Sequence, residues 1–284
     1  MKVRLHPSER EFGTVVDAVY RPDPVAYTVE LTTLRTPAAD GSRILVSVAD
    51  GATTVGAAVQ VTDAALLTTG LDPAHAADVV AALAPDHPGL PAVRGTRCSA
   101  TAFVTAWSAF TGTEAELTDV EPLYRLIDLA MPAGVSGQGR LALGRDVELL
   151  VGWLDAFFVE AFGAESDLVA RRAHLDEIAH ADGDIVVWTA GSVPVSMARV
   201  HAPLAGMSRI GPVYTPPERR GRGYAAAVTV AAARHAHRRG AREVVLFADA
   251  TNAVANRVYR RIGFAAVDEH LQYVLHPRSV EPQP

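Results

Sequence analysis

Apolar and polar positions divide the chain into two series of elements that follow the same order. Strand-like runs come first in each series, and helical runs with apolar residues three or four apart are placed among them. The expected strands cover residues 27–34, 44–49, 54–62, 65–69, 90–93 and 123–129, and then 141–143, 184–189, 194–201, 208–214, 243–248 and 267–275. The expected helices cover residues 73–83 and 99–110, then one that begins after Asp146, 166–179, 225–237 and 251–262.

The repeated order predicts a structural duplication of an α/β unit. Between the two series, residues 131–139 hold Pro132 and glycines 134, 137 and 139 with little apolar pattern, which is typical of a boundary. We therefore expect one domain in residues 1–135 and a second in residues 136–284. Each is then close to the common domain size of about 140 residues.

Composition narrows the class of protein. Apolar residues make up 49% and charged residues 20%, a globular profile, and the formal net charge of −6 argues against a general nucleic-acid binder. The longest nearly apolar run, residues 224–233, is half the length needed to cross a bilayer, and the start of the chain does not resemble a secretory signal. The single cysteine, Cys98, begins an apolar helical run, so we expect it to be buried, in a cytoplasmic protein.

The loop 216–225 joins a strand-like run to an Ala-rich helix. Three arginines stand directly before the helix (Arg219, Arg220 and Arg222), although each cation at this positive end costs about 0.3–1 kcal/mol without a counter-charge. Glycines 221 and 223 let the backbone approach a ligand and present free N–H groups, as helix starts do for phosphates. The matching helix start in the first series has Asp72 and Pro73, which cap it themselves. We therefore expect an anion site in the second series and none in the first.

Two sets of residues resemble the motifs of the GCN5-related N-acetyltransferase (GNAT) family. Its pyrophosphate pattern, Arg or Gln, two residues, Gly, one residue, then Gly or Ala, is matched by Arg220, Gly223 and Ala225. Its last-helix pattern is matched by Asn252, Asn256, Tyr259, Gly263 and Phe264. The resemblance covers about residues 140–275 and implies two GNAT-like units in tandem, the first degenerate, each with a mixed, mostly antiparallel sheet flanked by helices.

The geometry of the last helix agrees with this resemblance. At 100° per residue, Asn252, Asn256 and Tyr259 fall within about 60° of one another. Apolar residues 254, 258 and 262 occupy roughly the opposite side. One face therefore packs and the other serves a site, although a core tyrosine with a backbone partner is the structural alternative for Tyr259.

The resemblance also implies the chemistry: transfer of an acetyl group from acetyl-CoA, or another acyl-CoA, to a primary amine or peptide N-terminus, without a metal. Tyr259 would protonate the departing thiolate, and backbone N–H near Val213 would stabilise the oxyanion. The residues expected to bind the acyl-CoA are Val213, Tyr214, Arg220, Gly221, Arg222, Gly223, Tyr224, Ala225, Asn252 and Asn256. The acceptor pocket would include Trp153, Phe157, Phe158 and Phe162, unless these aromatic residues belong to the core.

Several alternatives stay open at this point. The general base could be Asp249, Glu243, His201, Glu177 or a water chain, and the three-residue steps of His174, Glu177 and His180 indicate a surface helix rather than a metal site. A non-catalytic acyl-CoA sensor would have the same binding motifs, and a homodimer is compatible with either function. A phosphate-loop hydrolase is excluded because it needs Gly, Lys and Ser or Thr in sequence, and the chain has no lysine beyond Lys2.

Overall fold

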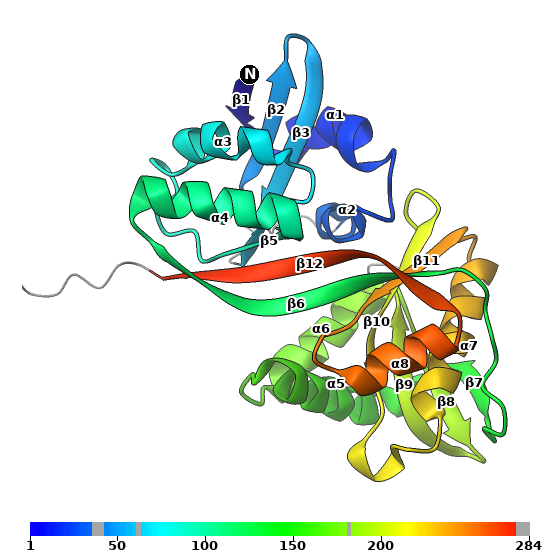
Figure 1. Ribbon diagram of the computed structural model, residues 1–284. Helices are drawn as coiled ribbons and strands as arrows, with labels where there is room; N and C mark the ends of the chain where they lie inside the picture. Colours follow the sequence, from blue (N-terminus) through cyan, green and yellow to red (C-terminus); the bar gives the residue numbers. More distant parts are fainter. Residues whose placement is uncertain (36–42, 61–63, 181–182, 277–284) are drawn as a thin grey trace, which may run out of the picture. The chain divides into compact units, whose positions relative to one another are not determined.

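The computed structural model describes residues 1–35, 43–60, 64–180 and 183–276, which form two compact units (Figure 1). Unit 1 comprises residues 1–123, 249–251 and 268–276, and unit 2 comprises residues 124–248 and 252–267. In each unit, antiparallel strand pairs outnumber parallel ones, and helices flank the sheet. The expected fold class is confirmed.

The boundaries of the units differ from the expected ranges 1–135 and 136–284. Residues 124–135 belong to unit 2, because Tyr124 and Leu126 pack in the core of that unit. Arg125 joins the same unit through two hydrogen bonds of 2.7 Å to the carboxylate of Glu243. The chain therefore enters unit 2 before the glycine-rich segment, and not after it.

Most of the last strand also lies in a different unit from the one expected. β12 (Phe264–His276) was expected to close the second domain, but from residue 268 onward it belongs to unit 1. There it pairs antiparallel with β5 (Ala92–Thr96), from His270 opposite Thr96 to Val274 opposite Ala92. The N-terminal unit is therefore completed by the C-terminal end of the described chain.

Unit 1 is built on a sheet whose neighbouring strands follow the order β1-β2-β3-β4-β5-β12. Its other strands are β1 (Lys2–Leu5), β2 (Leu45–Asp50), β3 (Thr53–Gln60) and β4 (Ala65–Leu67), and β6 (Glu114–Leu126) begins in this unit. β2, β3 and β4 pair antiparallel in succession, whereas β4 and β5 are parallel. The expected strands 44–49, 54–62, 65–69 and 90–93 are thus confirmed to within a few residues.

Four α-helices and two short helical turns complete unit 1. They are α1 (Glu9–Val15), the π-helical turn η1 (Val16–Tyr20), α2 (Thr28–Arg35), the 3-10 turn η2 (Pro73–His75), α3 (Ala76–Leu83) and α4 (Arg97–Thr111). α3 and α4 cover one face of the sheet, with Phe103 and Trp107 fully buried. Cys98, in the first turn of α4, is exposed, so the expectation that it is buried was wrong.

The strand expected at residues 27–34 was also wrong, because α2 occupies this segment. Its β-branched residues favoured a strand. In the helix, however, the Thr32 hydroxyl donates 2.8 Å to the Thr28 carbonyl oxygen, which is the back-bonded arrangement threonine adopts on helices. Thr28 and Leu31, three positions apart, are buried on the same side. Burial of this helical face outweighs the local propensity.

Unit 2 has strands in the order β11-β10-β9-β8-β7. They are β7 (Gln138–Leu141), β8 (Asp184–Ala190), β9 (Val193–Val200), β10 (Met207–Tyr214) and β11 (Glu243–Phe247). β7 to β10 pair antiparallel in succession, and β10 and β11 are parallel. The expected strands 184–189, 194–201, 208–214 and 243–248 are confirmed here to within a few residues, whereas the expected strand 141–143 overlaps β7 only at Leu141.

Helices cover both faces of this sheet. They are the 3-10 turn η3 (Gly144–Asp146), α5 (Val147–Phe162), α6 (Leu168–His180), the 3-10 turn η4 (Pro217–Arg219), α7 (Tyr224–Arg238) and α8 (Ala253–Arg261). Ile185 and Val187 pack toward α5 and α6, whereas Val186 and Trp188 pack toward α7. This alternation is the two-residue period of a strand buried on both faces. The alanines of α7 allow the helix to lie close against the sheet.

The two units share one topology. In each, three antiparallel strands lead into a helix, and the next strand returns parallel to the third strand: β2, β3, β4, α3 and β5 in unit 1, and β8, β9, β10, α7 and β11 in unit 2. The predicted duplication is therefore visible in the strand pairing. Among the described residues, no helix combines the length and the apolar character that a membrane span requires.

Candidate acyl-CoA site

β10 and β11 are paired along only part of their length. Their parallel register runs from Met207 opposite Glu243 to Ile210 opposite Leu246, and a bulge follows between Ile210 and Val213. Beyond the bulge, β10 continues to Tyr214 beside β9, where Val213 lies opposite Ala198. Residues 211–214 therefore have a side that no β11 residue in this register covers, and an extended ligand can pair with it.

The arginine loop follows directly. Gly221 and Gly223 have φ angles of 75° and 78°, which are favourable only for glycine among unstrained residues. Gly223 is the N-cap of α7, and no side chain caps this end. The first helical hydrogen bond is donated by Ala227 to the Gly223 carbonyl oxygen at 3.0 Å, so the N–H groups of the first turn remain without intrahelical partners.

The corresponding helix start in unit 1 is closed, as the sequence predicted. The Asp72 carboxylate accepts a hydrogen bond of 2.8 Å from the Ala74 N–H, and Pro73 occupies the first turn without contributing a donor. A second carboxylate or a phosphate would be repelled there. Only unit 2 therefore presents an uncapped helix start at this position of the duplicated fold.

Arg220 lies differently from expectation. Its guanidinium donates 2.5 Å to Glu160 Oε2, and its Nε donates 2.9 Å to the Thr215 carbonyl oxygen. Glu160 also accepts a hydrogen bond of 2.9 Å from the Tyr214 hydroxyl. The Arg220 side chain is thus tied to the end of β10, whereas Arg222 is exposed and forms no ion pair with a described residue.

Glu160 is the residue that sequence reasoning missed. It comes from the last turns of α5, within the aromatic run that contains Phe157, Phe158 and Phe162. A carboxylate among aromatic side chains is a usable signal, because such a group needs polar partners. Here its partners are Tyr214 and Arg220, two residues that were expected to bind acyl-CoA directly.

The aromatic residues of α5 divide into two groups. Trp153 and Phe157 pack against the core beside Tyr214, with the Trp153 and Tyr214 ring centroids 6.5 Å apart. Phe158 and Phe162 contact each other outside that core, and Phe162 is exposed. The alternative that these aromatic residues belong to the core therefore holds in part for the first two.

Asn252 and Asn256 have defined structural partners. Asn252 is the N-cap of α8, and its side-chain oxygen accepts 2.9 Å from the Ala255 N–H. Asn256 is buried, and its side-chain oxygen accepts 2.8 Å from the Tyr124 hydroxyl. Both side chains thus order α8 from within unit 2, and this contribution stands beside the expected acyl-CoA contact.

Tyr259 packs beside Tyr124, the residue that Asn256 contacts. It is 8% exposed, and its ring contacts those of Tyr124 and Phe264, with centroids 6.1 and 6.2 Å away. Among the described residues none forms a hydrogen bond with its hydroxyl. Burial raises the pKa of Tyr259 to about 12. The phenol is therefore protonated throughout the physiological range, and its O–H is not committed to another side chain.

Alkaline titration tests this environment. The unfolded chain loses a tyrosine proton near pH 10, whereas the folded pKa of Tyr259 is about 12, so the folded state retains that proton and stability falls between these pH values. Tyr259→Phe should therefore lose less stability than the wild type from pH 10 to 12, by roughly 1–3 kcal/mol. Urea unfolding at each pH measures the difference. Equal losses of stability in the variant and the wild type would contradict the raised pKa. The difference in stability between the two proteins below pH 10 serves as the baseline.

The candidate general bases are either engaged by other residues or weakly basic, where their side chains are described. Glu243 is engaged by Arg125, and Asp249 accepts hydrogen bonds from the N–H and hydroxyl of Thr251. Burial, together with Arg209 and Arg199, lowers the pKa of His201 well below its usual value, so this imidazole is neutral and weakly basic. The side chain of Glu177 lies outside the described ones.

The comparisons with known proteins agree with this geometry. A model of the acetyltransferase (GNAT) family matches residues 148–264, a range that contains β10, the arginine loop and α8. These residues are therefore similar in sequence to a GNAT domain. The motif residues on which the resemblance was based all fall within it, so the resemblance is confirmed.

Curated relatives of the GNAT domain match over part of their length. The mycothiol acetyltransferase of Amycolatopsis mediterranei is 34% identical over 110 residues, which are 36% of this chain and 35% of the relative. The mycothiol acetyltransferase of Saccharomonospora viridis is 39% identical over 67 residues, 22% of each chain. The matched segments thus span about a third or less of these relatives.

Solved structures match over nearly the whole chain. A tandem GNAT protein from the clavulanic acid biosynthesis pathway covers 99% of this chain and 100% of its own, with a TM-score of 0.57 and 13% identity. A GCN5-related N-acetyltransferase from Sphaerobacter thermophilus covers 99% and 97%, with a TM-score of 0.63 and 19% identity. At these identities the comparison concerns the fold alone, and it agrees with two GNAT-like units in one chain.

Proposed function

We propose that unit 2 transfers an acetyl group from acetyl-CoA to a primary amine. The observation that supports this most is the continuity of two features within the GNAT domain. The uncovered side of residues 211–214 leads directly to the uncapped start of α7 at Gly223. An extended amide-bearing arm and a pyrophosphate would need these two surfaces in this order.

The donor set fits acetyl-CoA, which supplies the acetyl group as a reactive thioester. The N–H groups around Gly221, Tyr224 and Ala225 would hold the pyrophosphate, with Arg222 as the nearby cation that forms no described ion pair. Backbone groups of Val213 and Tyr214 would pair with the pantetheine arm, since Pro212 has no N–H to donate. The expected roles of Asn252 and Asn256 are retained in the proposal, with their capping and Tyr124 contacts as a second role.

Replacing Arg222 and replacing Arg220 are expected to reduce acetyl-CoA affinity to different extents. Arg222→Ala should weaken acetyl-CoA binding about tenfold, because it removes a cation next to the pyrophosphate. Arg220→Ala should act mainly by releasing Glu160 and Tyr214, and should weaken binding less. Calorimetry of acetyl-CoA binding at two salt concentrations compares the two. Equal affinity of Arg222→Ala and the wild type would contradict this assignment.

Residues of this chain around the thioester would catalyse the acetyl transfer. The N–H near Val213 would stabilise the developing oxyanion, a contact worth roughly 2.7–4 kcal/mol in comparable sites. The Tyr259 hydroxyl, which its raised pKa keeps protonated, would give its proton to the departing sulfur. The amine needs to lose one proton, and a water chain is preferred as its acceptor because the candidate carboxylates are engaged elsewhere.

The acceptor would approach beside the aromatic end of α5. Phe158 and Phe162 lie there, beside the Glu160 carboxylate that Tyr214 and Arg220 hold in place. Unit 1 has a closed helix start, so we propose that it contributes structure rather than a second acyl-CoA site. A cytoplasmic location fits the single cysteine.

The test is a screen of amines, aminoglycosides, peptide N-termini and the acceptor of the mycothiol acetyltransferases, with CoA release as the readout. Amine-dependent release is expected for at least one class. Acetyl-CoA binding without release for any acceptor would instead support a non-catalytic sensor. Absence of acetyl-CoA binding would contradict both functions.

A further inference from the structure

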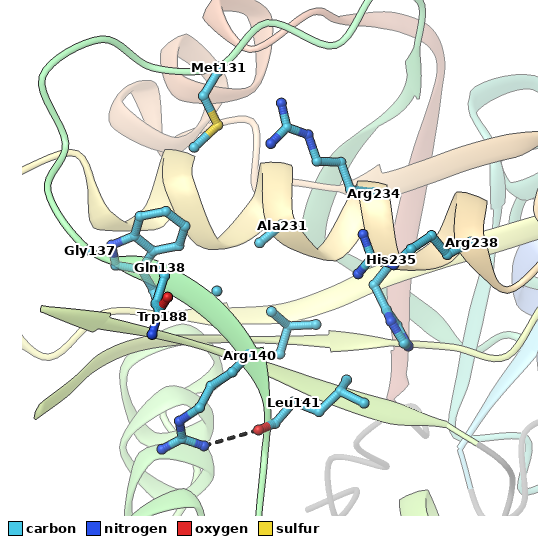
Figure 2. Close-up of a pocket in the computed structure, with 12 residues that line it drawn as sticks. Met131, Gly137, Gln138, Arg140, Leu141, Trp188, Ala231, Arg234, His235 and Arg238 are labelled. Carbon is cyan, nitrogen blue, oxygen red and sulfur yellow. Dashed lines mark hydrogen bonds between the residues drawn. The ribbon is translucent and has the colours of Figure 1, made fainter. Parts of the chain in front are cut away.

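An open cavity of unit 2 lies along the C-terminal half of α7, away from the helix start. Its volume is about 300 Å³, and it is enclosed by α7 on one side and by β7 and β8 on the other (Figure 2). Its lining residues are Met131, Gly137, Gln138, Gly139, Arg140, Leu141, Val186, Trp188, Ala231, Arg234, His235 and Arg238. This volume is at the lower end of the range for small-molecule sites, about 300–1,000 Å³.

The lining holds four basic side chains and no carboxylate. Arg140 is neutralised by Asp146, at 2.6 Å, and His235 shares the Asp184 carboxylate, at 2.7 Å, with Arg239. Arg234 and Arg238, by contrast, form no ion pair or side-chain hydrogen bond with any residue that the structure describes. Two uncompensated positive charges therefore face this cavity.

The helix dipole does not account for both arginines. Arg238 is in the last turn of α7, where a cation is favourable, but Arg234 lies one turn earlier, and the dipole effect falls off within the last turn. Like charges four residues apart on a helix destabilise it by about 0.2–0.5 kcal/mol. A bound anion would remove this repulsion.

Apart from Gln138, the remaining lining side chains are apolar. Met131 and Leu141 are each 43% exposed at the rim, although both are large apolar side chains. The Trp188 ring is fixed because its indole N–H donates 3.2 Å to the Ser136 carbonyl oxygen. Figure 2 shows Met131, Trp188 and Leu141 around the cavity, with Arg234, His235 and Arg238 on the helix side.

We propose that this cavity binds a small organic anion, whose carboxylate or phosphate contacts Arg234 and Arg238 and whose apolar body lies against Met131 and Trp188. Guanidinium groups bind both anions through paired hydrogen bonds. A body of one aromatic ring suits the volume. The binding site is separate from the proposed acyl-CoA site and does not depend on the proposed function.

Calorimetry with three probes tests the proposal on the full chain. Phenyl phosphate carries both features, inorganic phosphate carries only the charge, and benzyl alcohol carries only the ring. Phenyl phosphate should bind with a Kd of about 1 mM or lower, and each of the other two at least tenfold more weakly. Binding should weaken as salt is added, because the contact is ionic.

The variant R234A/R238A should reduce phenyl phosphate affinity at least tenfold. The matched control is R257A/R261A, which removes two exposed arginines at the same spacing from α8 and should leave affinity unchanged. M131D places a carboxylate on the exposed rim and leaves both arginines unchanged in the sequence. It should also reduce the affinity for phenyl phosphate, because the new negative charge repels the anion. Circular dichroism verifies that each variant is folded.

Four results would overturn the proposal. Phenyl phosphate could bind no more tightly than inorganic phosphate, or its affinity could be unchanged in both R234A/R238A and M131D. Its affinity could instead be lost in R222A alone, which would place it at the start of α7. A dimer seen by light scattering and abolished by R234A/R238A would assign the cavity to a second copy of the chain and reject a small ligand.

Discussion

Gly263→Ala is expected to destabilise unit 2 more than any other single methyl group added to a described glycine. Gly263 has a φ of 101°, and a Cβ at this position would lie 1.6 Å from the Asp128 carbonyl oxygen. The Gly263 carbonyl oxygen accepts hydrogen bonds from the N–H groups of Ile127, at 2.9 Å, and Asp128, at 3.3 Å. Because the contact is with backbone, a change of rotamer cannot relieve it, and the cost should be roughly 3 kcal/mol or more.

Urea unfolding followed by tryptophan fluorescence measures this effect. The control is Gly152→Ala on the exposed side of α5, where a Cβ meets no atom within 4 Å. That variant should gain about 0.5–1 kcal/mol, since alanine is favoured over glycine within helices. If Gly263→Ala unfolded at the same urea concentration as the wild type, the close approach of residues 127–130 to the end of α8 would be contradicted.

Tyr259→Phe is expected to have the largest effect on the proposed reaction. Loss of a positioned general acid should reduce kcat about 10²–10⁴-fold, while acetyl-CoA affinity changes little. Stability at neutral pH should also change little, because no described residue forms a hydrogen bond with the hydroxyl that is removed. Steady-state kinetics with the best acceptor, together with calorimetry, separates kcat from binding.

Tyr124→Phe is the matched control for this variant. Both tyrosines are buried and their rings are in contact, but the Tyr124 hydroxyl donates to the Asn256 side chain. Its loss removes a buried hydrogen bond, so stability should fall by about 0.5–1.5 kcal/mol with a smaller effect on kcat. If Tyr259→Phe retained the turnover of the wild type, Tyr259 would not be the acid.

The sequence predicted those parts of the site that depend on local patterns. The arginine loop and α8 carry their glycines, caps and spacings within about 15 residues each, so their helix starts were recognisable without long-range information. The closed helix start at Asp72 was recognisable for the same reason. The exposure of Cys98 was not, because the first turn of a helix can face either the core or solvent, and only the packing of α4 decides.

The parts of the fold and site that the sequence did not predict depend on contacts between residues far apart in the chain. The Glu160 carboxylate meets Tyr214 and Arg220 across 54 and 60 positions of the chain, and no spacing rule relates such residues. β12 was predicted as a strand, but its partner β5 lies more than 170 positions earlier. Periodicity indicates which segments form strands and leaves their neighbours undetermined. The compact units differ from the expected domain ranges for the same reason.

The pairing of β12 with β5 has a consequence for synthesis on the ribosome. Residues 1–123 emerge first, but the strand that covers the edge of β5 is translated only after residue 267. Until that strand emerges, the nascent chain keeps an open strand edge, which is the kind of edge that chaperones shield and that other chains can join. Co-translational folding of unit 1 is therefore delayed until residues 268–276 have emerged, and a ribosome stalled before codon 268 would hold an incomplete N-terminal unit.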